Sequence, residues 1–154
     1  MSTNYELVNL SWQEYDELVF NILKQLKTKR IDYLVPILRG GAVLGLSLAS
    51  NLQLPTMYMR IKRSESNQPN SDFGAPNLLG CDDLQDITDK NILICEDTID
   101  TEKTLKFALE YLGKYKPKNI YVATLFNFSK NTSYISGKKM SEHKWIVFPW
   151  ERGL

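Results

Sequence analysis

The chain has 154 residues, which is enough for one domain with a buried core and too few for a second catalytic domain. Its 19 lysine and arginine residues nearly balance 18 acidic residues, so there is no global field to recruit nucleic acid or an anionic membrane. The start lacks a basic segment followed by an apolar core, and no run approaches the ~18 apolar residues of a membrane span. Cys81 and Cys95 form neither a metal-spaced pair nor a disulfide framework. We expect one soluble, cytoplasmic domain over residues 1–154.

Apolar runs typical of buried strands alternate with segments of helical periodicity along the chain. The first helix begins with a capping box, in which Ser11 caps and Glu14 follows three residues later. Residues 62–77 are polar, with two prolines and a glycine, and predict a long mobile loop. The predicted elements in chain order are a helix over residues 12–28, a strand over 33–38, a helix over 42–52, a strand over 56–61, a strand over 91–95, a helix over 102–114, a strand over 119–126 and an edge or returning strand over 145–150.

This alternation predicts an α/β domain with a parallel sheet, covered on both faces and joined by right-handed crossovers. In such sheets ligands bind at the carboxyl ends of the strands. The turns after Leu38 and after Cys95 both lie at such ends. These two turns are therefore the candidate ligand sites.

The turn after Cys95 carries acids and threonines just before a predicted helix, within the sequence ILICEDTIDTEKT of residues 92–104. Carboxylates at a strand end can hold a sugar diol or a water-rich Mg²⁺ ion. Threonine hydroxyls and the free amides of a helix N-terminus can receive a phosphate. The combination suits a phosphorylated sugar. The alternative is an acidic turn in which Asp100 or Thr101 only caps the helix.

Residues 92–104 resemble the phosphoribosyl diphosphate (PRPP) signature of type I phosphoribosyltransferases, which has four hydrophobic residues, two acids and a turn of the form Asp-Thr-Gly-x-Thr. The resemblance implies the single-domain fold of that family, a mainly parallel sheet flanked by helices with a small hood. It implies that Glu96 and Asp97 contact the ribose hydroxyls, directly or through Mg²⁺, and that residues 101–104 wrap the 5-phosphate. Asp100 would face N7 of a purine as the general base. The residues assigned to PRPP are Arg39, Gly40, Glu96, Asp97, Thr98, Asp100, Thr101, Glu102, Lys103 and Thr104.

The chain departs from the family pattern within this signature. Glycine usually stands where this chain has Glu102, and a small residue often stands where it has Lys103. Glycine permits a positive φ and a close approach of the backbone to phosphate, and glutamate forfeits both. The Glu102 side chain could point to solvent, and Lys103 could offset its charge.

The segment Arg39-Gly40-Gly41 is often just a tight turn, but the family places a short loop of this kind against the pyrophosphate of PRPP. The resemblance makes Arg39 the cation there and Leu38-Arg39 a non-proline cis peptide. Residues 62–77 occupy the position of the family's flexible hood, although they could equally be a passive insertion.

The sequence WIVFPWE at residues 145–151 resembles the purine-binding segment of the xanthine-guanine and hypoxanthine-guanine phosphoribosyltransferases. Trp145 would stack on the base, and the backbone around Ile146 would recognise the edge of the base. Alternatively, the segment is an aromatic edge strand that packs on the core. In either case Trp150 is assigned to the core. Phe128 stands where the purine enzymes carry a lysine that donates to the 6-oxo group. Lys130 could replace that donor if the strand continues, or could be a solvated surface lysine.

His143, the only histidine, has no neighbouring nucleophile or second metal ligand in the sequence and is predicted to lie on the surface. The leading hypothesis is a Mg²⁺-dependent purine phosphoribosyltransferase, which combines PRPP with guanine, xanthine or hypoxanthine to give a nucleoside monophosphate and pyrophosphate. Relatives are usually dimers or tetramers, so a homodimer or homotetramer is expected. The departures at Glu102 and Phe128 motivate an alternative, a non-catalytic PRPP or nucleotide-binding regulator on the same fold. A more remote alternative is an unrelated doubly wound α/β binding domain.

Overall fold

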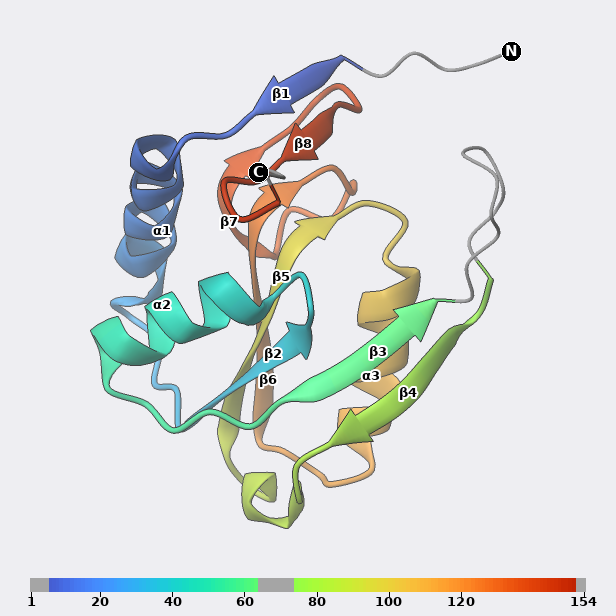
Figure 1. Cartoon of the computed structure of the whole chain (residues 1–154). Helices are drawn as coiled ribbons and strands as arrows, with labels where there is room; N and C mark the ends of the chain where they lie inside the picture. Colours follow the sequence, from blue (N-terminus) through green and yellow to red (C-terminus); the bar gives the residue numbers. More distant parts are fainter. Residues whose placement is uncertain (1–5, 64–73, 152–154) are drawn as a thin grey trace.

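The structure is a computed structural model, and it describes residues 6–63 and 74–151 (Figure 1). Strands and helices alternate through most of this part of the chain, as the sequence predicts. The elements are β1 (Leu7–Asn9), α1 (Trp12–Leu26), β2 (Tyr33–Leu38), α2 (Ala42–Leu52), β3 (Met59–Arg63), β4 (Pro76–Cys81), a short 3-10 helix (Gln85–Ile87), β5 (Asn91–Ile99), α3 (Lys103–Gly113), β6 (Asn119–Asn127), β7 (Ile135–Lys139) and β8 (Trp145–Val147).

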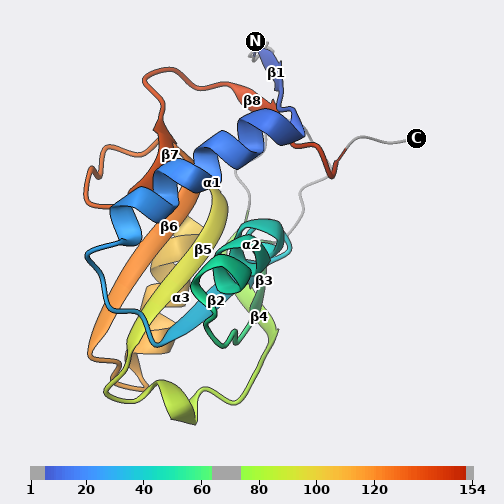
Figure 2. The same cartoon turned by 90° about the vertical axis from the view of Figure 1, so that its left-hand side faces the viewer.

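Six strands form the central sheet in the order β4-β3-β2-β5-β6-β7, and only the β3–β4 pair is antiparallel. Helices α1 and α2 cover one face, and α3 covers the other (Figures 1 and 2). Strands β1 and β8 pair in parallel as a separate two-stranded sheet. The prediction of a mainly parallel sheet flanked by helices is confirmed. No helix in the described residues is long and apolar enough to cross a membrane.

Helix α1 begins where its sequence signals place it. The Glu14 amide donates to the Ser11 hydroxyl at 3.2 Å, and the Ser11 amide donates to the Glu14 carboxylate at 2.7 Å. These reciprocal bonds satisfy backbone donors that a helix N-terminus otherwise leaves unpaired. The buried Tyr15 then forms a 2.6 Å hydrogen bond with Ser47 of α2. The two helices are therefore tied together on one face of the sheet.

The amino-terminal edge of the sheet is closed by a chain of polar side chains. The Asp32 carboxylate accepts from the backbone N–H of Asn91 at 2.8 Å and from its side chain at 3.3 Å. The Asn119 side chain donates to Asn91 Oδ1 at 2.8 Å. These bonds link the starts of β2, β5 and β6. The Asn91 amide is the main reason that the pKa of Asp32 is lowered from its ordinary value.

Three strands, β1, β4 and β7, were not predicted. Strand β1 is only three residues long, and the sequences of β4 and β7 lack a clear strand pattern. Strand β4 contains Pro76 and Gly80, and pairs with β3 on the outer edge. Strand β7 has the polar sequence ISGKK and forms the other edge. The predicted loop over residues 62–77 is therefore shorter than expected, because β3 and β4 extend into it; residues 64–73, which include most of the predicted hood, lie outside the described residues.

Four predicted strands have different bounds in the structure, and β6 differs least because it ends one residue later, at Asn127. Strand β3 begins at Met59 because Thr56 makes only an isolated bridge to Leu34. Strand β5 continues four residues beyond Cys95, since its parallel pairing with β6 runs on to Ile99. The carboxy-terminal strand β8 is only three residues long, and β1 is its partner. The extension of β5 brings its acidic residues into the sheet itself.

Candidate functional site

The two predicted turns lie against each other at the carboxyl edge of the sheet. A Cβ atom built on Gly40 would lie 2.6 Å from Asp97 Oδ2, and one on Gly41 would lie 2.0 Å from the Cys95 carbonyl oxygen. A side chain at position 41 would collide with the backbone of β5, so this approach requires glycine, and one at position 40 would displace the Asp97 carboxylate. The peptide bond Leu38-Arg39 is cis, as the resemblance implied, and Arg39 is exposed.

Asp97 is held in place at the centre of this contact. Its Oδ1 accepts from the Thr98 amide at 2.6 Å, and the Thr124 hydroxyl donates to its backbone carbonyl at 3.1 Å. Burial raises the pKa of Asp97 above its ordinary value, and the negative charge of Glu151 acts in the same direction. A cation beside Asp97 would counter both effects.

Glu96 and Asp97 do not point to the same side. They are neighbours within β5, and successive side chains of a strand point to opposite faces. Glu96 lines a hollow at the start of α3, whereas Asp97 lies against Gly40. In the part of the chain that the structure describes, no three His, Cys, Asp or Glu side chains are grouped to hold a metal ion. Mg²⁺ commonly binds through one or two carboxylates with substrate phosphates and water, so a single carboxylate of this pair fits such a site.

The hollow at the start of α3 opens to solvent. Helix α3 begins at Lys103, with Glu102 at the N-cap position, so neither Asp100 nor Thr101 caps it. The alternative reading of the acidic turn as a simple cap is wrong, because the last residue before the helix is left-handed and its side chain makes no capping bond. The hollow is lined by Glu96, Thr98, Ile99, Asp100, Thr101, Glu102, Lys103, Thr104 and Leu105.

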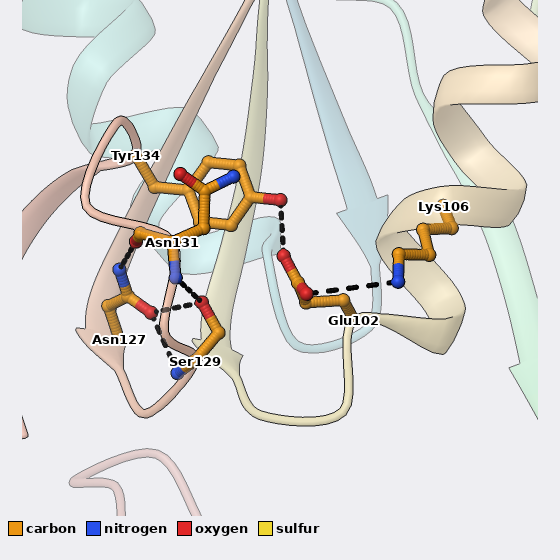
Figure 3. Close-up of polar contacts among 6 residues, drawn as sticks. All are labelled: Glu102, Lys106, Asn127, Ser129, Asn131 and Tyr134. Carbon is orange, nitrogen blue, oxygen red and sulfur yellow. Dashed lines mark hydrogen bonds and ion pairs between the residues drawn. The ribbon is translucent and has the colours of Figure 1, made fainter.

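Glu102 keeps the backbone conformation that glycine would provide. Its φ is 59°, in the left-handed region that side chains other than glycine seldom adopt. The side chain does not point to solvent: the Tyr134 hydroxyl donates to its carboxylate at 2.5 Å (Figure 3). Lys106 Nζ lies 3.9 Å from the other carboxylate oxygen, so Lys106 forms an ion pair with Glu102.

The loop that carries Tyr134 is braced by its own side chains (Figure 3). The buried Asn127 accepts from the amide and hydroxyl of Ser129 at 2.9 and 2.8 Å. Its amide group donates to the Asn131 carbonyl oxygen at 2.8 Å. Nothing in the sequence pointed to Tyr134, which lies 32 residues from Glu102. The loop therefore presents Tyr134 to the start of α3 from a fixed position.

On the other side of the turn, Asp100 contacts His143. Asp100 Oδ2 and His143 Nε2 are 2.6 Å apart, and the imidazole stacks on Phe128 with ring centroids 5.2 Å apart. His143 is exposed, as predicted, and its contact with Asp100 is one that the sequence did not indicate. Its partner Asp100 is 43 residues away in the sequence, so local spacing could not reveal the pair.

The remaining predicted base-site residues differ in their surroundings. Trp145 is 53% exposed, which leaves a ring face for stacking, and Ile146 is buried beside it. Trp150 packs on the core and stacks on Phe148 with centroids 4.6 Å apart, as predicted. Lys130 is exposed, but β6 ends at Asn127, so the premise that a continuing strand carries Lys130 on the face of Phe128 is wrong.

A family model described as the phosphoribosyl transferase domain matches residues 2–154. The chain belongs to the phosphoribosyl transferase domain family. Its fold is the type I phosphoribosyltransferase fold, and the unrelated doubly wound domain is excluded. The phosphoribosyl transferase domain of this chain is similar to the purine phosphoribosyltransferase from Pyrococcus horikoshii OT3, with a TM-score of 0.78, 26% identity and coverage of 97% of this chain and 96% of that one.

The phosphoribosyl transferase domain also shares 41% identity over 68 residues with hypoxanthine-guanine phosphoribosyltransferase of Bos taurus. That match covers 44% of this chain and 30% of the bovine protein, so it spans less than a third of the relative. A structure from Neisseria gonorrhoeae with bound ppGpp is similar at a TM-score of 0.80 and 19% identity, covering 96% of this chain and 90% of that one. At that identity the likeness shows the fold alone.

Proposed function

We propose that this domain is a Mg²⁺-dependent purine phosphoribosyltransferase. It transfers ribose 5-phosphate from PRPP to hypoxanthine, guanine or xanthine, giving the nucleoside monophosphate and pyrophosphate. The observation that carries the proposal is the close contact between the Gly40 turn and Asp97, where a Cβ atom added to Gly40 would lie 2.6 Å from Asp97 Oδ2. This contact brings together the turn proposed to bind the diphosphate and the strand end proposed to bind the ribose. The similarity to a purine phosphoribosyltransferase over nearly the whole chain supports the substrate class.

In this proposal the sugar phosphate binds in the hollow at the start of α3. The first turn of a helix leaves backbone N–H groups unpaired, and these attract anions such as the 5-phosphate. Thr101 and Thr104 add hydroxyls from the same lining, and Glu96, which also lines the hollow, would contact the ribose hydroxyls. Lys103 contributes a cation to this lining.

The diphosphate lies toward the glycine turn in this proposal. Arg39 is exposed there and can form charge-assisted hydrogen bonds to the diphosphate oxygens. Asp97 or Glu96 would hold Mg²⁺, which when bound supplies positive charge to the departing diphosphate. Gly40 keeps the turn close to Asp97, so these groups act on one end of the substrate.

The base binds between Asp100 and Trp145. Trp145 offers an exposed ring face for stacking, and the backbone at Ile146 reads the edge of the base. His143 is positioned to donate to Asp100 Oδ2, which leaves Oδ1 to accept the proton from N7. The Phe128 ring stacks on the imidazole of His143 and so helps to fix its orientation. Lys130 stays a candidate donor to the 6-oxo group from the loop after β6.

The reaction exchanges one bond at the anomeric carbon for another. The bond from C1 to the diphosphate oxygen breaks, the bond from C1 to the base nitrogen forms, and the base loses its proton to Asp100. The sugar passes through an oxocarbenium-like state, so the site must stabilise charge rather than supply a covalent nucleophile. Arg39 stabilises the negative leaving group and Asp100 removes the positive charge that develops on the base.

The test is an assay with Mg²⁺, PRPP and a panel of bases, in which nucleotide formation is followed by chromatography. We expect a nucleoside monophosphate from at least one of hypoxanthine, guanine and xanthine. If PRPP or a nucleotide binds in calorimetry but no base gives product, the non-catalytic regulator is supported and the proposed reaction is contradicted.

A further inference from the structure

The glutamate before α3 places a negative charge beside the amides that would receive a phosphate. Glu102 occupies the N-cap position and lines the same hollow as Thr101 and Thr104. Carboxylates near a helix N-terminus are themselves attracted to its unpaired amides. An unrestrained Glu102 side chain would therefore compete with any anionic ligand for this site.

Two other side chains contact the Glu102 carboxylate (Figure 3). The Tyr134 hydroxyl donates to Oε1 at 2.5 Å, and Lys106 Nζ lies 3.9 Å from Oε2. Glu102 makes no side-chain capping bond to the helix. The carboxylate is thus paired with Tyr134 of the loop before β7 and with Lys106 of α3.

Tyr134 is well suited to this restraint. Burial is the main cause of its raised pKa, and the hydrogen bond to Glu102 also raises it, so the hydroxyl stays protonated and remains a donor at neutral pH. The loop that presents it is braced by the bonds of Asn127 to Ser129 and Asn131. Releasing the carboxylate would require breaking a short bond to a charged acceptor, which is stronger than a neutral one.

We propose that Tyr134 is a positioning residue that keeps the anion site at the start of α3 open by holding Glu102 aside. The ligand that benefits is the 5-phosphate of the sugar, so this inference rests on the proposed function. Lys106 assists from the helix, and its exposed position makes it the weaker of the two restraints.

A double-mutant cycle of Tyr134→Phe and Glu102→Gly tests the proposal, with ribose 5-phosphate as the probe in calorimetry. Tyr134→Phe should weaken binding by about tenfold, the size expected when a hydrogen bond to a charged group is lost. Glu102→Gly should bind at least as tightly as the parent, because glycine accepts the left-handed φ of 59° and removes the competing charge. The double variant should match Glu102→Gly.

The matched control is Tyr33→Phe, a half-buried tyrosine at the amino-terminal end of β2, which should bind ribose 5-phosphate like the parent. An equal loss from Tyr134→Phe in the Glu102→Gly background would overturn the proposal, because Tyr134 would then act without Glu102. Thermal melting shows whether each variant is folded.

Hydrogen exchange without ligand separates this inference from the proposed function. In Tyr134→Phe the released carboxylate should cap the amides of Thr104 and Leu105 and slow their exchange several-fold. The slowing should be absent from the double variant. If the parent binds no ribose 5-phosphate, the proposed function fails, yet this exchange pattern still supports the inference; unchanged exchange in Tyr134→Phe contradicts it.

Discussion

The two edges of the central sheet use the same strands for different purposes. At the amino-terminal edge, Asp32, Asn91 and Asn119 bond to one another within 2.8 to 3.3 Å across β2, β5 and β6. At the carboxyl edge, polar residues from the end of β5 and from the turn into α3 line a hollow that opens to solvent. The amino-terminal edge pairs its polar groups with one another, whereas in the proposed function the carboxyl edge presents polar groups to a ligand. Substitutions at the two edges should therefore affect different properties.

Asp100→Asn should have the largest effect on activity. If Asp100 accepts the proton of the base, turnover should fall by about 10²- to 10⁴-fold, the usual contribution of general acid–base catalysis. PRPP affinity should change little, because Asp100 contacts the base and not the sugar in the proposed complex. Steady-state kinetics with PRPP and the best base measure both quantities. Unchanged turnover would remove Asp100 from the catalytic role.

Gly40→Ala should have the next largest effect, which is weaker binding of PRPP. The added methyl group would lie 2.6 Å from Asp97 Oδ2, so the turn or the carboxylate must move. We expect the KM for PRPP to rise about tenfold. Gly113→Ala is the matched control, since a Cβ there meets nothing within 4 Å and the KM should stay unchanged. An equal effect from both variants would mean that the contact at Gly40 is not specific.

His143→Ala should have a smaller effect on activity, and this effect should involve the reaction of the base and not the binding of PRPP. Loss of the 2.6 Å contact leaves Asp100 less firmly oriented, and the imidazole no longer stacks on Phe128. We expect kcat to fall about fivefold with the KM for PRPP unchanged, as for loss of one hydrogen bond. His143→Gln keeps a donor and should recover most of the loss. A parallel rise in the KM for PRPP would instead place His143 in sugar binding.

Asp32→Ala should leave activity at the parent level and lower stability. Loss of the Asn91 hydrogen bonds should reduce the free energy of unfolding at pH 7 by about 1 kcal/mol. Because the folded pKa of Asp32 is lowered, its contribution is complete above the unfolded pKa of about 3.9 and is lost as the pH falls through the folded value. Urea unfolding of parent and variant should therefore converge toward about pH 2. If the difference in the free energy of unfolding between parent and variant does not change with pH, the ionised Asp32 carboxylate is not the cause of that difference.

Sequence patterns predicted the parts of the molecule that depend on local order. The capping box of α1, the strand, turn and helix around Asp97, and the glycine turn after Leu38 are all contiguous segments. Their apolar periodicity and turn residues depend on neighbours a few positions away. The α/β fold therefore followed from the sequence, with its two candidate turns at the correct edge.

The contacts that shape the site could not be predicted in this way. The bonds from Tyr134 to Glu102 and from His143 to Asp100 join residues 32 and 43 positions apart. They exist because the loops after β6 and β7 return over the carboxyl edge, and tertiary packing sets that path. The edge strand β7 was missed for a related reason: its polar residues lack the alternation of a half-buried strand.

The proposed function requires PRPP to bind at the carboxyl edge of the sheet, and amide chemical-shift mapping with Mg²⁺ and PRPP can locate the bound ligand. The largest shifts should fall on Gly40, Gly41 and residues 97–104, while the amides of Asn91 and Asn119 at the other edge should stay unchanged. Shifts centred on the amino-terminal edge, or no shifts at saturating PRPP, would contradict it.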